Sequence, residues 1–269
     1  MSNMLRLSKS GIEYLDYSWG VYSGCKNPSN VCAIRNNCWA KSIVQRFSAH
    51  YPNGFEPTWY PEAFFSPLSL NKPSVIGVGW MGDMFGDWVD PNELSGIWEP
   101  VDRKYGLTIR EMVFLVMERC PQHRFLFLTK CPQNYVKWQR FPQNAAVGAT
   151  AVDDLGYVET LALLSPVKAR LKYLSIEPML GPISDTGAFM KAAGVGWIIV
   201  GAATKPFRPP KVEWVEELVW ACVNARLPVW LKNNLAPALP KTLPFYVPPL
   251  ETPDKGEIKM QYRQEIPDW

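Results

Sequence analysis

The chain is poor in histidine and has no long apolar segment. Only two of its 269 residues are histidine, His50 and His123, which disfavours histidine-based metal binding and acid–base catalysis. No apolar run approaches the roughly 20 residues of a membrane span, and residues 1–11 lack the apolar core of a secretory signal peptide. We therefore expect a soluble, cytoplasmic protein with no membrane partner.

Several motifs of well-defined chemistry are also missing. The sequence contains no phosphate-binding P-loop, no G-x-S-x-G elbow and no H-E-x-x-H helix. The segment GVGWMG (77–82) matches G-x-G-x-x-G, but it lies inside an apolar run and leads into turn-like residues. A dinucleotide-binding loop must open a helix, so no such site is expected here. Internal repeats and low-complexity segments are absent as well.

The overall composition is that of an ordinary globular protein. Apolar residues make up 47% and charged residues 20%, and the length suffices for one large domain with a buried core. The net charge of +3 is mild and by itself gives little support for a nucleic-acid partner. The 25 prolines, about twice the usual share, predict many ordered loops.

Short apolar runs that end in polar or small residues recur along the chain. They cover residues 75–83, 124–130, 145–152, 171–178, 196–204 and 227–234. Continuous apolarity is typical of strands buried on both faces, as in parallel sheets. Helical patterns lie between several of them, at 107–120, 153–164 and 212–225. This alternation predicts an α/β fold over residues 1–235, either a parallel (β/α) barrel or a doubly wound sheet. The proline-rich residues 236–269 are expected to form an irregular strap packed on it.

The ends of the predicted strands carry polar or small residues. These are Asp83, Lys130, Thr150, Glu177, Gly201 to Thr204 and Lys232 to Asn234. In a parallel barrel the carboxyl ends of the strands face one side, where active sites assemble. The series therefore predicts a concave polar site with carboxylates and lysines, although each residue by itself could simply begin a loop.

Three of the six cysteines lie within 14 positions, at Cys25, Cys32 and Cys38, just before a helical run. We expect Trp39, Ile43 and Phe47 on the inner face of that run. The reducing cytoplasm favours metal binding over disulfides. Three thiolates on one loop suit an iron–sulfur cluster with one open iron, but the spacing C-x6-C-x5-C leaves zinc almost as plausible, with His50 as a conceivable fourth ligand.

The other three cysteines are expected to be passive thiols. Cys222 falls on the apolar stripe of the predicted helix at 212–225 and is expected in the core. Cys131 follows a strand end and so could approach the polar site.

A set of motifs in a fixed order resembles a known family. The motifs are SGC…C…CWA, WMGDMFG (80–86), FLTKCPQN (127–134), VGATAVDD (147–154), LSIEPMLGPI (174–183), IIVGAATKPFRPPKVEWV (198–215) and PVWLKNNL (228–235). They look like the phage- and prokaryote-associated, three-cysteine radical-SAM-like proteins of unassigned function. The resemblance runs from about residue 17 to residue 235.

The resemblance implies a complete or partial (β/α) barrel of the radical-SAM type. Cys25, Cys32 and Cys38 would hold a [4Fe–4S] cluster, and S-adenosylmethionine would bind its fourth iron and be cleaved reductively to a 5′-deoxyadenosyl radical. The implied cofactor-binding residues are Trp39, Asp83, Thr150 and Gly201, with Asp83 accepting from the methionine ammonium. The implied catalytic residues are Lys130, Glu177 and Lys232. An electron donor would reduce the cluster, and the unknown substrate has nucleic acid or a nucleoside among its candidates.

Two departures from the family pattern affect these expectations. Many relatives have C-x6-C-x2-C, so this loop carries three additional residues between Cys32 and Cys38. Many also have G-G-E where this chain has Gly201-Ala202-Ala203, which puts one cofactor contact in doubt. The main alternative from the sequence is a zinc-stabilised nucleic-acid-binding or adaptor protein in which the cysteine loop is structural. A second is a member that keeps a cluster but has lost the cofactor site.

Overall fold

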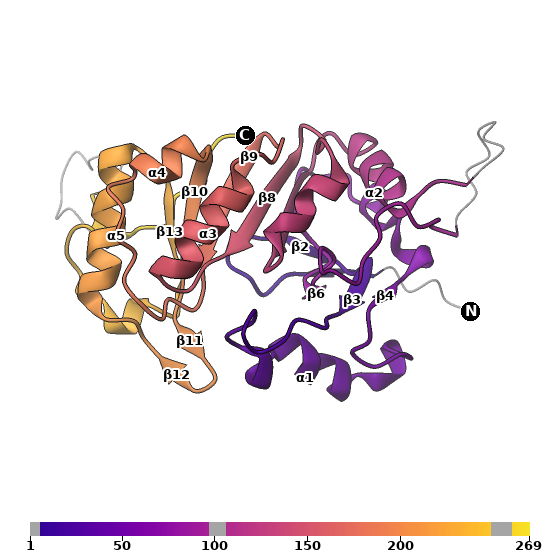
Figure 1. Cartoon of the computed structure of the whole chain (residues 1–269), viewed down its shortest axis with the longest axis horizontal. Coiled ribbons are helices and arrows are strands. Elements are labelled where there is room, and N and C mark those ends of the chain that lie inside the picture. Colours follow the sequence, from indigo (N-terminus) through magenta and orange to yellow (C-terminus); the bar gives the residue numbers. More distant parts are fainter. Residues whose placement is uncertain (1–5, 97–105, 249–259) are drawn as a thin grey trace. The chain divides into compact units, whose positions relative to one another are not determined.

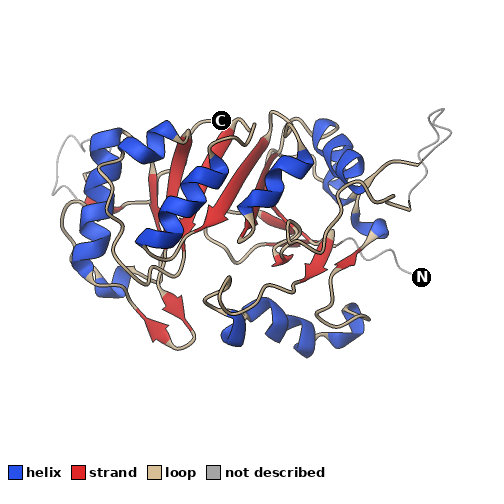
Figure 2. Cartoon of the chain, viewed as in Figure 1, coloured by secondary structure: helices blue, strands red, loops and turns tan. Residues whose placement is uncertain are grey.

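The computed structural model describes residues 6–96, 106–248 and 260–269. The chain divides into two compact units, one formed by residues 1–149 with 166–170, the other by residues 150–165 with 171–269. Each unit is mixed α/β, and the main strands within each unit are mostly parallel. The expected α/β class is therefore confirmed. Figure 1 identifies the elements and Figure 2 shows helices flanking the strands in both units.

The first unit contains two groups of strands. The main group runs in the order β1-β2-β5-β7-β8, with β1 antiparallel to β2 and the other pairs parallel. The bounds are β1 Leu7–Lys9, β2 Tyr17–Trp19, β5 Val75–Val78, β7 Arg124–Thr129 and β8 Ala145–Thr150, the last of which ends at the unit boundary. A small sheet has the order β4-β3-β6, with bounds β3 Tyr22–Gly24, β4 Thr58–Trp59 and β6 Met81–Gly82.

The helices of the first unit are α1 (Trp39–Arg46) and α2 (Ile109–Glu118). The 3₁₀ turns are η1 Arg35–Asn37, η2 Ser48–His50, η3 Pro61–Ala63, η4 Ser66–Ser69 and η5 Pro132–Trp138. α2 begins with a capping box in which Thr108 and Glu111 satisfy each other's backbone amides. Its predicted apolar face is fully buried, as expected from the 3.6-residue periodicity.

The second unit contains the parallel strands β9 (Leu171–Ile176), β10 (Val195–Val200) and β13 (Val229–Leu231), in that order. Two hairpin-like pairs accompany them, β11 Ala203–Thr204 with β12 Phe207–Arg208 and β14 Tyr246–Val247 with β15 Gln261–Tyr262. The helices are α3 (Asp154–Leu164), α4 (Ala188–Ala192) and α5 (Val212–Ala225), and η6 covers Ala236–Ala238. No helix in the described parts of the chain has both the length and the apolarity to cross a membrane.

Residues 263–265 of the predicted C-terminal strap lie along β13. Leu231 and Arg263 are joined by a backbone hydrogen bond of 3.0 Å, and Glu265 donates its amide to the Val229 carbonyl at 2.9 Å. The Trp197 indole also donates to the Glu265 carbonyl. The boundary predicted at residue 235 stays a prediction, and residues 249–259 of the strap lie outside the described residues.

Two helix faces differ from those expected. In α1 the buried residues are Ala40 and Val44, whereas Trp39 and Phe47 are 40% and 46% exposed. In α3 the apolar repeat Leu155, Val158 and Leu161 would be expected to form the packed face, but Leu155 and Val158 are 82% and 59% exposed and only Leu161 is buried. The buried side of α3 is instead formed by Tyr157, Thr160, Leu161 and Leu164. In both helices apolar residues occur on more than one side, so periodicity alone could not identify the packed face.

Candidate functional site

The cysteine loop begins where two strands approach each other closely. Gly24 ends β3 with a φ of +91°, and a Cβ there would lie 2.3 Å from the Glu56 carbonyl oxygen. Its neighbour Gly82 ends β6, where a Cβ would lie 2.1 Å from the Gly24 oxygen. Only glycine tolerates this geometry at either position. Cys25 and Asp83, the residues that follow these glycines, therefore start from the carboxyl ends of adjacent parallel strands.

All three loop cysteines are free thiols between β3 and α1 (Figure 1). Cys32 is buried, and Cys25 and Cys38 are half-buried. The Asn27 amide donates to the Cys25 sulfur at 3.4 Å, and the Arg35 guanidinium donates to the Cys25 carbonyl at 3.2 Å. Hydrogen bonds to sulfur are one of the means by which proteins tune iron–sulfur clusters. The loop thus has the donor chemistry of the predicted site.

Burial raises the pKa of the Cys25 thiol to about 11, while the hydrogen bond from Asn27 and the charge of Lys130 act in the opposite direction. A neutral thiol becomes a metal ligand only by releasing its proton. Within residues 6–96, 106–248 and 260–269, no three His, Cys, Asp or Glu side chains are close enough together to hold a metal ion. The three cysteines are the right type of donor for a cluster, but the described residues do not bring three such side chains around one ion. Cluster binding therefore stays a prediction.

Asp83 accepts four hydrogen bonds and is only 5% exposed. One carboxylate oxygen accepts from the Asn27 side-chain amide at 2.9 Å and from the Lys130 backbone amide at 3.0 Å. The other accepts from the Thr129 hydroxyl at 2.7 Å and the Phe85 amide at 3.2 Å. The carboxylate thereby joins the cysteine loop to the ends of β6 and β7.

These contacts give Asp83 a structural role. A carboxylate offers about four acceptor positions, and all of them are used by groups of the protein itself. A contact with a methionine ammonium would have to replace one of these donors. Asp83 therefore positions the cysteine loop, and its contact with the cofactor stays a prediction.

Asn27, which the sequence did not single out, and Cys131, which was expected to approach the polar site, extend this network. The Cys131 thiol donates a hydrogen bond to the side-chain oxygen of Asn27 at 3.1 Å. The side-chain NH₂ group of Asn27 donates to Asp83. The Cys131 amide in turn donates to Thr129 at 2.9 Å. Burial raises the pKa of Cys131 to about 12, with nearby carboxylates adding to the effect. Cys131 thus approaches the cysteine loop. Nothing in the sequence indicated the role of Asn27 except its position between Cys25 and Cys32.

In the second unit, Glu177 and Lys232 form an ion pair of 2.5 Å at the ends of β9 and β13. Their side chains are 25% and 14% exposed. Gly201, at the end of the intervening β10, lies against both of them: an added Cβ would be 3.0 Å from Glu177 Cγ and 3.1 Å from Lys232 Cδ. The glycine therefore leaves the space in which the acid and the amine meet.

Asn234 fixes the segment that follows Gly201. Its side chain accepts from the Ala202 amide at 3.1 Å and donates to the Ala202 carbonyl at 3.0 Å. These paired bonds hold the backbone at Ala202 in place. The sequence indicated Asn234 as a strand-end residue but not its hydrogen bonds to the Ala202 backbone.

The predicted site residues thus fall into two groups, one in each unit. The first unit holds Cys25, Cys32, Cys38, Trp39, Asp83 and Lys130. The second holds Thr150, Glu177, Gly201 and Lys232. Thr150 is half-buried at the end of β8, and its carbonyl accepts from the Thr160 hydroxyl at 3.5 Å. His123 lies fully buried beside the Leu70 carbonyl, consistent with a core residue.

Comparisons with known proteins give one family and one solved structure. The solved structure is spore photoproduct lyase complexed with dinucleoside spore photoproduct, similar over 98% of this chain and 73% of its own, at 9% identity and a TM-score of 0.43. No curated protein matches the sequence. The family, described as "Protein of unknown function (DUF5131)", matches residues 9–236 and so most of the chain.

Proposed function

We propose that the chain, which belongs to the DUF5131 family of proteins of unknown function, is a radical S-adenosylmethionine enzyme. The observation that supports this most is the position of the cysteine loop. It starts at the carboxyl end of a parallel strand and is tied by the buried Asp83 to the ends of two further strands. In α/β folds, sites assemble at this end of the strands. The finer fold expected from the resemblance, a complete or partial (β/α) barrel, is part of the proposal.

Cys25, Cys32 and Cys38 would hold a [4Fe–4S] cluster, with the Asn27 amide bonded to the Cys25 sulfur. When bound, the cluster would supply the electron that cleaves S-adenosylmethionine to methionine and a 5′-deoxyadenosyl radical. A cytoplasmic electron donor would be the partner for this reduction. Asp83, Asn27 and Thr129 position the loop through hydrogen bonds that Asp83 accepts from the other two side chains.

The remaining residues take their roles from the resemblance. Trp39, at the first position of α1, would lie beside the cluster, and Lys130 would face the cofactor or the substrate. Thr150 and Gly201 are proposed to bind the cofactor, and Glu177 and Lys232, which form an ion pair, are proposed catalytic residues. The substrate itself stays open, with nucleic acid or a nucleoside among the candidates.

The test uses anaerobically purified and reconstituted protein. We expect about four iron and four sulfide atoms per chain, an electron paramagnetic resonance signal that changes on adding S-adenosylmethionine, and formation of 5′-deoxyadenosine. Cys32→Ser should reduce the iron content to background. Cys222→Ala, which removes a thiol from the core of α5, is the matched control and should leave the iron content unchanged. Zinc without iron would instead support the structural reading of the loop, and a cluster that does not respond to S-adenosylmethionine would contradict the proposed enzyme class.

A further inference from the structure

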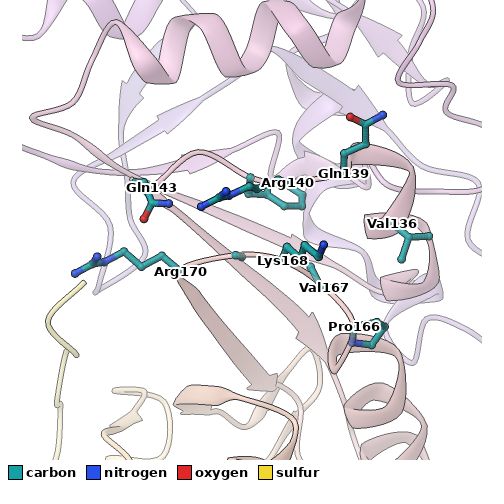
Figure 3. A pocket seen from close by; sticks show the side chains of 10 residues that line it. Val136, Gln139, Arg140, Gln143, Pro166, Val167, Lys168 and Arg170 are labelled. Carbon is teal, nitrogen blue, oxygen red and sulfur yellow. The ribbon is translucent and has the colours of Figure 1, made fainter.

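The first unit contains a cavity of about 600 Å³ away from the cysteine loop. It is lined by two segments that are distant in the sequence, residues 136–143 and 166–170 (Figure 3). The first segment precedes β8, and the second precedes β9. The cavity therefore adjoins the amino end of β8, whereas the cysteine loop, Asp83 and Lys130 follow the carboxyl ends of β3, β6 and β7.

Backbone contacts hold these two segments together. Arg140 and Lys168 form a parallel bridge, and the Phe141 amide donates to the Lys168 carbonyl at 3.1 Å. Phe141 and Val167 are buried beneath the cavity, at 2% and 5% exposed. The frame of the cavity is thus part of the packed structure, and the side chains of the rim project from it.

Gln139 has a positive φ of 62°, a backbone conformation that non-glycine residues rarely adopt. This strained residue lies between η5 and the bridge to Lys168, on the rim of the cavity. Strained backbone is more frequent at ligand-binding positions than elsewhere, which is consistent with a site here.

The rim is strongly basic. Arg140, Lys168 and Arg170 line the cavity together with the amides of Gln139 and Gln143, and none of the ten lining residues is acidic. All three cations are exposed, and no ion pair joins any of them to a residue that the structure describes. Figure 3 shows the Arg140 and Arg170 side chains extending in the same direction near Gln143, while Lys168 points the opposite way. Such a set of like charges repels itself unless an anion binds.

We propose that this cavity binds the phosphate group of a nucleotide-sized ligand. Guanidinium groups form paired hydrogen bonds to phosphate oxygens, and Arg140 and Arg170 both present such a group on the rim of this cavity. The volume lies within the usual range for small-molecule sites. The exposed apolar surface of Val136 and Pro166 offers a wall for the rest of the ligand, and the glutamine amides can hydrogen-bond to it. This inference goes beyond the proposed cofactor chemistry and does not depend on it.

The phosphate can belong to a free nucleotide or to a nucleotide within a strand. The experiment separates these sources by titrating the purified chain with adenosine monophosphate and, in a second arm, with single-stranded oligothymidylate, each at low and high salt. The test variant is Arg140→Gln with Arg170→Gln. The control is Arg208→Gln, which removes one exposed arginine from β12 in the second unit.

We expect the double variant to weaken binding of at least one probe about tenfold or more, since it removes the charge-assisted hydrogen bonds of two guanidinium groups. Arg208→Gln should leave that affinity unchanged. Loss of nucleotide binding would assign the site to free nucleotides, and loss of oligonucleotide binding alone would assign it to a strand. Absence of binding by both probes, or equal binding by the double variant, would overturn the proposal. Because no cluster is required, this result is independent of the iron and 5′-deoxyadenosine measurements.

Discussion

Replacement of Asp83 by alanine tests whether this carboxylate organises the cysteine loop. The change removes the acceptor of four hydrogen bonds at a position that is 5% exposed. The Asn27 amide and the Thr129 hydroxyl can rotate toward other partners, but the backbone amides of Phe85 and Lys130 cannot. A buried donor without a partner costs about 1–3 kcal/mol, so the two fixed amides together predict a loss of about 2–6 kcal/mol in the free energy of unfolding.

Asp83→Asn refines this estimate because asparagine has nearly the same shape. One of the two carboxylate oxygens would be replaced by an NH₂ group, which cannot accept a hydrogen bond. If the NH₂ group replaces the oxygen bonded to Asn27 and Lys130, the Asn27 side chain can flip to present its own oxygen, but the Lys130 backbone amide loses its acceptor. We therefore expect about 1–3 kcal/mol of destabilisation, less than for alanine.

The assay is urea unfolding of the protein without added iron, followed by tryptophan fluorescence. Asp268→Ala, which removes an exposed carboxylate, serves as the matched control and should change the stability by less than about 0.5 kcal/mol. If Asp83→Ala were as stable as this control, the carboxylate would not hold the loop. Its importance would then lie in contact with a cofactor alone.

Three further changes probe other parts of the structure. Gly201→Ala should lower the stability by up to about 1 kcal/mol, measured by thermal unfolding, because the added Cβ would lie 3.0 Å from Glu177 and 3.1 Å from Lys232 and both side chains would have to shift slightly. The stability should fall as the pH drops below about 6.5, measured by urea unfolding between pH 8 and pH 5, because burial lowers the pKa of His123 and the unfolded chain then binds the proton more readily. Thr108→Ala should cost about 0.5–2 kcal/mol by removing the cap of α2, measured by urea unfolding.

Each of these changes has its own control. Gly11→Ala adds a Cβ where nothing lies within 4 Å, so it should be neutral, and equal effects at both glycines would contradict the role of the close contacts at Gly201. His123→Gln should flatten the pH dependence between pH 6.5 and the lower folded-state pKa, and an unchanged slope would show that another group titrates. Thr108→Ser keeps the cap and should preserve the stability, whereas a loss equal to that of alanine would point to the methyl group.

The strands could be predicted from the sequence because each is a short, continuous apolar run. β7 and β8 fill residues 124–129 and 145–150 of the runs expected there, and their inner residues are buried. α2 and α5 were predictable for the complementary reason that their apolar residues form a single stripe. In α3 both Leu155 and Tyr157 could have formed the packed face, and Tyr157 is the buried one. Which of them is buried depends on tertiary contacts that the sequence of the helix does not reveal.

The candidate site was predictable where a residue follows a strand. Asp83 and Glu177 were both expected as strand-end residues, because the end of an apolar run is visible in one dimension. Their partners were not predicted: the Asp83 contacts with Asn27 and with the Lys130 backbone span 56 and 47 residues. The basic cavity was missed for the same reason, since Arg140 and Lys168 become neighbours only through a bridge between two loops.

The segment along β13 also has a consequence for handling the protein. An uncovered strand edge offers free amides and carbonyls to other molecules, and it is a common origin of aggregation. Here Arg263 and Glu265 occupy those groups on Leu231 and Val229. A purification tag added after Trp269 leaves these bonds intact, whereas a chain shortened before Gln261 would expose the edge of β13 and favour insoluble association during expression.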